Sequence, residues 1–211
     1  MGYTLPANLG VDALDEYCGN VTANLIKASK RIPDILPLIP PWEQMEIEFT
    51  TYLDERRQLR RTLNQERAGV KITDVYWDED VGVVSSESYH VSGKKADQDP
   101  YRSLFGTTKA ADARKLGPDE ATKFGDSLIE RAKVLNHPGL VVSIAAFEAT
   151  NNELRDAGKA RSAAASAVEL HILKGRQMIP KVQELIDKTE AALLTIRPGD
   201  DKLIRAILSP D

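Results

Sequence analysis

The chain has 211 residues, enough for one full-sized hydrophobic core or two small ones. Its 42% hydrophobic and 28% charged residues are typical of a soluble globular protein, and a net charge of −4 argues against a general affinity for nucleic acid or anionic membranes. The single cysteine excludes an internal disulfide, and no stretch approaches the roughly 18 apolar residues of a membrane-spanning helix. Because the amino terminus lacks a secretory signal, we expect a cytoplasmic protein.

The first predicted element is a helix over residues 11–32. Apolar side chains recur there at steps of three and four residues, which places them on one face of an α-helix. These are Val11, Leu14, Cys18, Val21, Leu25, Ala28 and Ile32. The proline-rich stretch 33–41 ends this helix, and a second helix with the same spacing runs from Pro41 to Gly69. The short connection predicts an antiparallel helical hairpin over residues 1–69.

Residues 70–116 have a different composition. They begin rich in Val, Tyr, Thr and Trp, and residues 74–99 hold seven acids against two lysines. This composition favours β structure, so we predict an acidic β-hairpin-like or extended arm inserted between two helical hairpins. An isolated two-stranded hairpin is marginally stable, and the arm is therefore expected to dock on the bundle or on a partner.

A second helical hairpin is predicted over residues 117–211. Pro118 opens a helix that residues 136–139 break, and a fourth helix follows at Leu140. We expect Gly175 to end or bend that helix and Pro180 to begin or kink a fifth segment, before a short C-terminal helix. The predicted fold class is thus all-α, an antiparallel bundle of long helices with the arm inserted, forming one compact domain.

The sequence lacks the common motifs for catalysis and metal binding. No HExxH, Glu-x-x-His, EF-hand loop, P-loop, Gly-x-Gly-x-x-Gly or Gly-x-Ser-x-Gly pattern occurs, and the chain has three histidines. We therefore predict no catalytic residue, no metal site and no cofactor, and we favour a role that is not enzymatic.

Three polar residues occupy positions that the apolar spacing assigns to buried helix faces: Arg56, Asn151 and Arg161. A buried charge is costly unless it is paired, whereas a polar residue in a helix seam can fix register and partner choice. Two interpretations stay open, a register device and exposure at a helix edge with the arginine stems reaching water. A polar pocket around these residues is the basis of one alternative function, a ligand-binding or enzymatic bundle.

Two charged clusters are further candidates for contacts. The basic cluster on the second helix comprises Arg56, Arg57, Arg60 and Arg61, and the predicted arm holds Trp77 with the acidic run Asp78, Glu79 and Asp80. The arginines could bind nucleic-acid phosphates, form an ordinary charged face, or pair with an acidic surface of the same or a neighbouring chain. We regard nucleic-acid binding as the weaker alternative because no aromatic residues are interleaved.

A belt of small residues over 157–167 either packs within the bundle or contacts another subunit. Together, the helix seams, this belt and the arm predict a non-catalytic structural or interaction protein. It is expected to assemble with itself as a homo-oligomer, or to bind another protein, through its helix faces and the arm.

Overall fold

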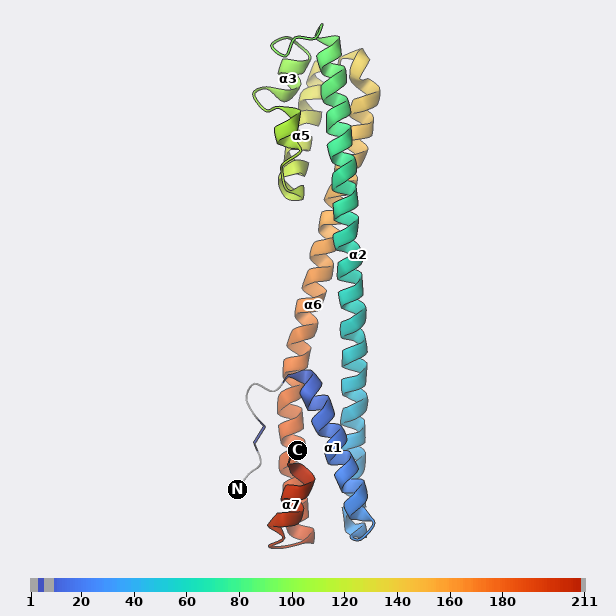
Figure 1. The fold of residues 1–211 in the computed structure, drawn as a ribbon, viewed down its shortest axis with the longest axis vertical. Coiled ribbons are helices and arrows are strands. Elements are labelled where there is room, and N and C mark those ends of the chain that lie inside the picture. The colour runs from blue at the N-terminus through green and yellow to red at the C-terminus, as the bar shows by residue number, and fades with distance from the viewer. Residues whose placement is uncertain (1–3, 6–9, 210–211) are drawn as a thin grey trace. The chain divides into compact units, whose positions relative to one another are not determined.

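The computed structural model describes residues 4–5 and 10–209, and within these ranges every regular element is helical (Figure 1). In chain order the elements are α1 (Val11–Ser29), the 3₁₀ helix η1 (Pro33–Leu38), α2 (Ile39–Val91), α3 (Tyr101–Phe105), α4 (Ala110–Ala113), α5 (Pro118–Leu135), the 3₁₀ helix η2 (Pro138–Leu140), α6 (Val141–Ile196) and α7 (Asp201–Leu208). The all-α fold class is confirmed. In the described part of the chain, no helix combines the length and apolarity needed to cross a bilayer.

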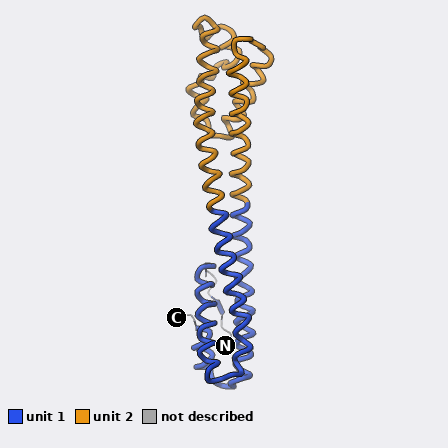
Figure 2. Tube along the Cα trace, turned by 90° about the vertical axis from the view of Figure 1, so that its right-hand side faces the viewer, with its two compact units in different colours: residues 1–60, 167–211 blue, residues 61–166 orange. Residues whose placement is uncertain are grey.

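The chain divides into two compact units, each with a hydrophobic core of its own (Figure 2). Unit 1 comprises residues 1–60 and 167–211, and unit 2 comprises residues 61–166. The long helices α2 and α6 contribute one segment to each unit. We describe the two units separately.

The core of unit 1 is built from α1, η1, α7 and segments of α2 and α6. The face of α1 predicted from the spacing is buried at Leu14, Cys18, Val21 and Leu25. Two polar contacts tie distant segments to this core: the indole of Trp42 donates to Thr189 Oγ1 over 2.9 Å, and the Tyr17 hydroxyl donates to the carbonyl of Leu208 over 3.0 Å. The second contact fastens α7 against α1.

The core of unit 2 gathers aliphatic and aromatic side chains from α2, α3, α5 and α6. Its buried members include Val70, Trp77, Val81, Val84, Leu104, Phe105, Leu128, Phe147 and Leu154. Helix α5 begins at Pro118 and ends before Asn136, which adopts the left-handed conformation (φ 44°). Both ends agree with the sequence prediction, because proline suits a first helical turn and asparagine tolerates that conformation.

The predicted β-hairpin-like arm over residues 70–116 is wrong. Helix α2 does not end at Gly69 but continues to Val91, and two short helices, α3 and α4, follow. Val70, Trp77, Val81 and Val84 recur at helical spacing and are all buried. Valine and tryptophan lie only about 0.5 kcal/mol below alanine in helix propensity, whereas burying such a side chain contributes about 1.5–3 kcal/mol. The buried stripe therefore decides the conformation.

Helix α6 continues through Gly175 and Pro180, so Gly175 does not end a helix and Pro180 does not begin one, while a bend or kink at these residues stays a prediction. Gly175 has a packing role in unit 1. A Cβ atom at this position would lie 2.3 Å from the hydroxyl oxygen of Tyr52, so glycine allows this close approach between α6 and α2.

Candidate functional site

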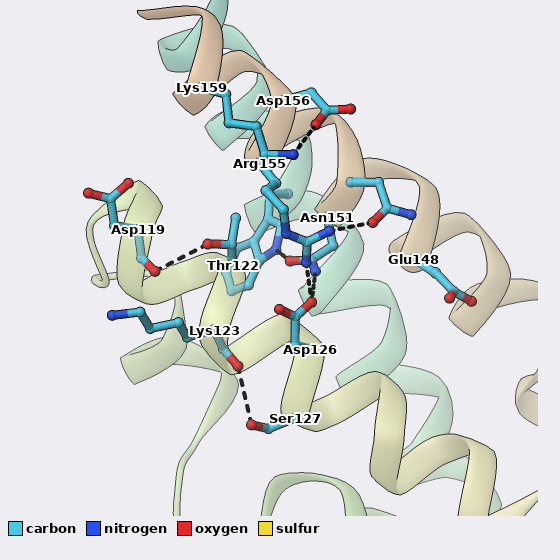
Figure 3. A network of polar contacts seen from close by, with 12 residues as sticks. Asp119, Thr122, Lys123, Asp126, Ser127, Glu148, Asn151, Arg155, Asp156 and Lys159 are labelled. Atoms are coloured by element: carbon cyan, nitrogen blue, oxygen red, sulfur yellow. Dashed lines mark hydrogen bonds and ion pairs between the residues drawn. The ribbon is translucent and has the colours of Figure 1, made fainter. Parts of the chain in front are cut away.

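Asn151 of α6 lies at the centre of unit 2 and is completely buried. Its side-chain oxygen accepts a hydrogen bond from the indole N–H of Trp77 on α2 over 3.0 Å, and its amide donates to Asp126 Oδ1 on α5 over 2.9 Å. Arg155, one turn along α6, donates to the same oxygen of Asp126 (Figure 3). We call Trp77, Asp126, Asn151 and Arg155 the polar junction.

The polar junction joins three helices through directional bonds. Both ends of the Asn151 amide have partners, and the charge of Asp126 is balanced by the guanidinium of Arg155. An amide offers neither a proton nor a base for catalysis, but it requires matched partners when it is buried. Asn151 is therefore not exposed at a helix edge, and its role in setting the register of α2, α5 and α6 stays a prediction.

Close packing surrounds the polar junction. A Cβ atom on Gly125 of α5 would lie 2.1 Å from Asn151 Oδ1, so a larger residue would collide with the amide. The ring of Trp77 packs at 5.5 Å from that of Phe147 and makes an edge contact with Phe124 at 6.3 Å. These contacts fix the indole so that its N–H points at Asn151.

A cleft of about 360 Å³ lies beside the polar junction, between α5 and α6 of unit 2. Its lining is formed by Pro118, Asp119, Thr122, Leu154, Arg155, Gly158, Lys159 and Ser162. Gly158 and Ser162 belong to the predicted belt of small residues and leave space for the cleft. The two cations already have acidic partners, because Arg155 pairs with Asp126 and Lys159 pairs with Asp156 at 2.9 Å.

The three polar seam residues have different surroundings. Arg56 belongs to unit 1, where its guanidinium lies 2.6 Å from Asp12 Oδ1 and, by donating this hydrogen bond, lowers the pKa of Asp12. Asn151 and Arg161 belong to unit 2, and Arg161 is half-buried there. The shared pocket around all three residues stays a prediction.

The remaining predicted arginines lie on exposed parts of α2. Arg57 pairs with Asp54 one turn away at 2.9 Å, and the charge of Arg60 contributes to the low pKa of Asp12. Arg61 is exposed, and no described residue forms an ion pair with it. Phosphate binding by this basic cluster also stays a prediction.

The acidic run of the predicted arm lies in the C-terminal part of α2. Trp77 is buried, Glu79 is exposed, and the carboxylate of Asp80 accepts a hydrogen bond from Thr150 over 2.5 Å. The backbone carbonyl of Asp78 accepts a hydrogen bond from Arg114 Nε. Burial raises the pKa of Asp78, and the neighbouring Asp74 raises it further, although Arg114 opposes the shift. The pKa of Asp74 is also raised by burial.

Sequence reasoning missed a buried histidine in unit 1. His171 Nε2 lies 2.9 Å from the backbone carbonyl of Tyr52, and its ring stacks on the Tyr52 ring at 4.2 Å. Because a carbonyl only accepts, Nε2 carries the proton. Nδ1 lies 3.6 Å from Glu55 Oε2. His171 precedes two buried residues of α6 at helical spacing, Gly175 by four residues and Met178 by seven. This spacing is the sequence signal that could have identified it.

A pair of acids in unit 1 was also missed. Burial raises the pKa of Asp15 on α1, and the charges of Glu46 on α2 and Asp12 raise it further. Within the described part of the chain, Oε1 of Glu46 is buried without a hydrogen-bond partner. Cys18 lies near this pair, and burial, with smaller effects of both acids, raises the pKa of its thiol to about 12.

Several large apolar side chains are exposed on outward helix faces, which the sequence analysis did not predict. In unit 2, Ile72, Val75, Tyr76 and Val83 of α2 are 47–54% exposed. In unit 1, Leu170 and Leu173 of α6 are 62% and 50% exposed. Exposed apolar residues that share a face are typical of interaction surfaces.

Among the described residues, no three His, Cys, Asp or Glu side chains are grouped so that they could hold a metal ion. Comparisons with protein-family models, with curated proteins and with solved structures find no match for this chain. The functional argument therefore rests on the geometry of the two units.

Proposed function

We propose that this chain is a non-catalytic interaction protein that associates with itself or with another protein through exposed helix faces. The observation that supports this proposal is the pair of apolar faces on α2 and α6, where half or more of a leucine, isoleucine or tyrosine side chain is accessible. A helix within a folded unit gains stability when such side chains are covered. Their exposure is consistent with burial against a partner.

The polar junction supports the same proposal in another way. Asn151 and its partners hold α2, α5 and α6 of unit 2 in one register, so the outward face of α2 is presented on a rigid support. A rigid face loses little conformational entropy on binding, which favours association.

The experiment uses the purified full chain and two surface variants. Ile72→Ser with Tyr76→Ser alters the face of α2, and Leu170→Ser with Leu173→Ser alters that of α6, while Val134→Ser serves as a control because Val134 is 89% exposed on α5. Sedimentation velocity over a concentration series measures self-association. Capture from a lysate of the source organism, compared between wild type and variants, measures binding to other proteins.

We expect at least one of the double variants to lose an association that the wild type and the control retain. The proposal is wrong if the wild-type chain stays monomeric at every concentration and captures no protein whose recovery depends on either face. Circular dichroism of each variant verifies that the helices remain folded.

A further inference from the structure

Helix α2 changes the sign of its charge at Ile72. Residues 56–71 carry six cations and one acid, whereas residues 72–87 carry five acids and no cation. The cations are Arg56, Arg57, Arg60, Arg61, Arg67 and Lys71, and the acids of the second stretch are Asp74, Asp78, Glu79, Asp80 and Glu87.

The apolar face of α2 in unit 2 spans this change of sign. At about 100° per residue, Ala68, Ile72, Val75, Tyr76 and Val83 lie on the side of the helix opposite its buried stripe. We call these five residues the α2 outer face. Arg61, Arg67 and Lys71 are exposed beside it, and none of them forms an ion pair with a described residue.

We propose that a second copy of this chain docks antiparallel on the α2 outer face, about a two-fold axis near Ile72. The inference rests on the proposed function and names the partner. Antiparallel pairing places the basic stretch of each copy over the acidic stretch of the other, whereas parallel pairing would align like charges. A two-fold axis repeats every contact, which makes one self-complementary patch sufficient.

The positions along α2 agree with this arrangement. Residues equally far from Ile72 face each other, so Tyr76 of one copy covers Ala68 of the other, and the two Ile72 side chains meet at the axis. Arg61 and Glu79 both lie within about 20° of Ile72 around the helix, so Arg61 of one copy comes about one helical turn from Glu79 of the other.

Charge reversal tests the pairing directly. The basic variant is Arg61→Glu with Arg67→Glu, the acidic variant is Asp78→Lys with Glu79→Lys, and the control is Arg102→Glu with Lys123→Glu, which reverses two exposed cations of α3 and α5. We expect each α2 variant alone to weaken self-association by on the order of tenfold to a hundredfold. An equimolar mixture of the two α2 variants should regain wild-type association, because every facing pair is then complementary.

Cysteine cross-linking tests the orientation. Under mild oxidation, Ile72→Cys should form a covalent dimer, because this position meets its own copy at the axis. Val83→Cys should not, because in an antiparallel pair it faces the region of Arg61. Parallel pairing would cross-link both variants, since each residue would then face its own copy. Cys18 is buried and serves as an internal control that stays reduced.

The outcomes separate this inference from the proposed function. Rescue in the mixture together with cross-linking at residue 72 alone supports antiparallel pairing. If the wild type self-associates but the α2 variants behave like the control, the inference is wrong while the proposed function stands. If the wild type is monomeric yet captures another protein through α2, the inference is likewise wrong. Melting curves measured by circular dichroism confirm that each variant is folded.

Discussion

Trp77 donates its indole N–H to the side-chain oxygen of Asn151 over 3.0 Å, in the buried centre of unit 2. This bond links α2 to α6, two helices that are distant in the sequence but in contact in unit 2. Trp77→Phe removes the donor and leaves the amide oxygen of Asn151 buried without it, so we expect a loss of about 1–3 kcal/mol of unfolding free energy. Urea unfolding combined with hydrogen exchange of unit 2 peptides measures this loss.

The double variant Trp77→Phe with Asn151→Leu provides the control for that first prediction. Removing both polar partners leaves no unsatisfied amide, and Asp126 keeps its bond to Arg155. The double variant should therefore be more stable than the sum of the single effects predicts. Additive losses would show that the bond contributes nothing specific.

Gly125→Ala should destabilise unit 2, although alanine is the better helix former. The added Cβ would lie 2.1 Å from Asn151 Oδ1, and overpacking of this kind costs about 1–3 kcal/mol. Gly158→Ala on α6 is the matched control, because no atom lies within 4 Å of its Cβ position, and it should gain up to about 1 kcal/mol. Thermal unfolding of the three proteins tests the difference, and equal shifts for both variants would contradict the close approach.

Asp12 and Asp15 of α1 should affect the pH dependence of stability in opposite directions. Because the pKa of Asp15 is raised, ionising this carboxyl costs more free energy in the folded chain than in the unfolded chain. This penalty on stability is present above the folded pKa and absent below the ordinary pKa of 3.8. Asp15→Asn should thus stabilise the protein at pH 7, by about 0.5 kcal/mol for a partly hydrated site, and have no effect near pH 3.

Asp12→Asn is the opposite case. Because the hydrogen bond from Arg56 lowers the pKa of Asp12, the charged form contributes stability above the ordinary pKa, and this contribution disappears as the pH falls through the lowered pKa. The variant should therefore be less stable than wild type at pH 7 and equal to it at strongly acidic pH. Urea midpoints measured at several pH values for both variants test these two predictions. Stability changes of the same sign for both variants at pH 7 would contradict them.

Cys18 should be inert in the folded protein. Its thiol is buried and its pKa is raised to about 12, so the thiolate that reacts with alkylating reagents is scarce at pH 8. We expect labelling by iodoacetamide to proceed only through opening of unit 1, and to become rapid in urea. Mass spectrometry of intact protein against time measures the rate. Immediate labelling in native buffer would contradict the packing of α1.

Helical spacing predicted much of the fold. The stripe through Leu14, Cys18 and Val21 is buried as expected, and α5 begins at Pro118 and ends at Leu135 as predicted. Residues 70–91 combine a composition that favours β structure with the spacing of a helix, and these two signals predict different conformations. Val70, Trp77 and Val81 follow the same three- and four-residue steps as the other helices, but only their burial in unit 2 shows that this spacing outweighs the composition.

The site was less accessible to sequence reasoning. Asn151 was identified as a polar residue in an apolar stripe, but its partners Trp77 and Asp126 lie on other helices and share no local pattern with it. In α6, steps of three and four residues from Val168 lead to His171 and Ile172, and the structure buries His171 and leaves Ile172 42% exposed. Two adjacent positions can satisfy a helical period nearly equally, and the stacking of Tyr52 on His171 decides between them.

The sequence by itself determined that most of this protein is helical, which face of α1 is buried, and that residues 56–71 are basic whereas residues 72–87 are acidic. These properties depend on local spacing and charge, which need no partner to be recognised. Only the tertiary structure decided that α2 continues to Val91, that Asn151 bonds to Trp77 and Asp126, and that Ile72 and Tyr76 face outward. Burial and hydrogen bonding depend on residues distant in the chain, and packing therefore selects among conformations that local propensity leaves nearly equal in energy.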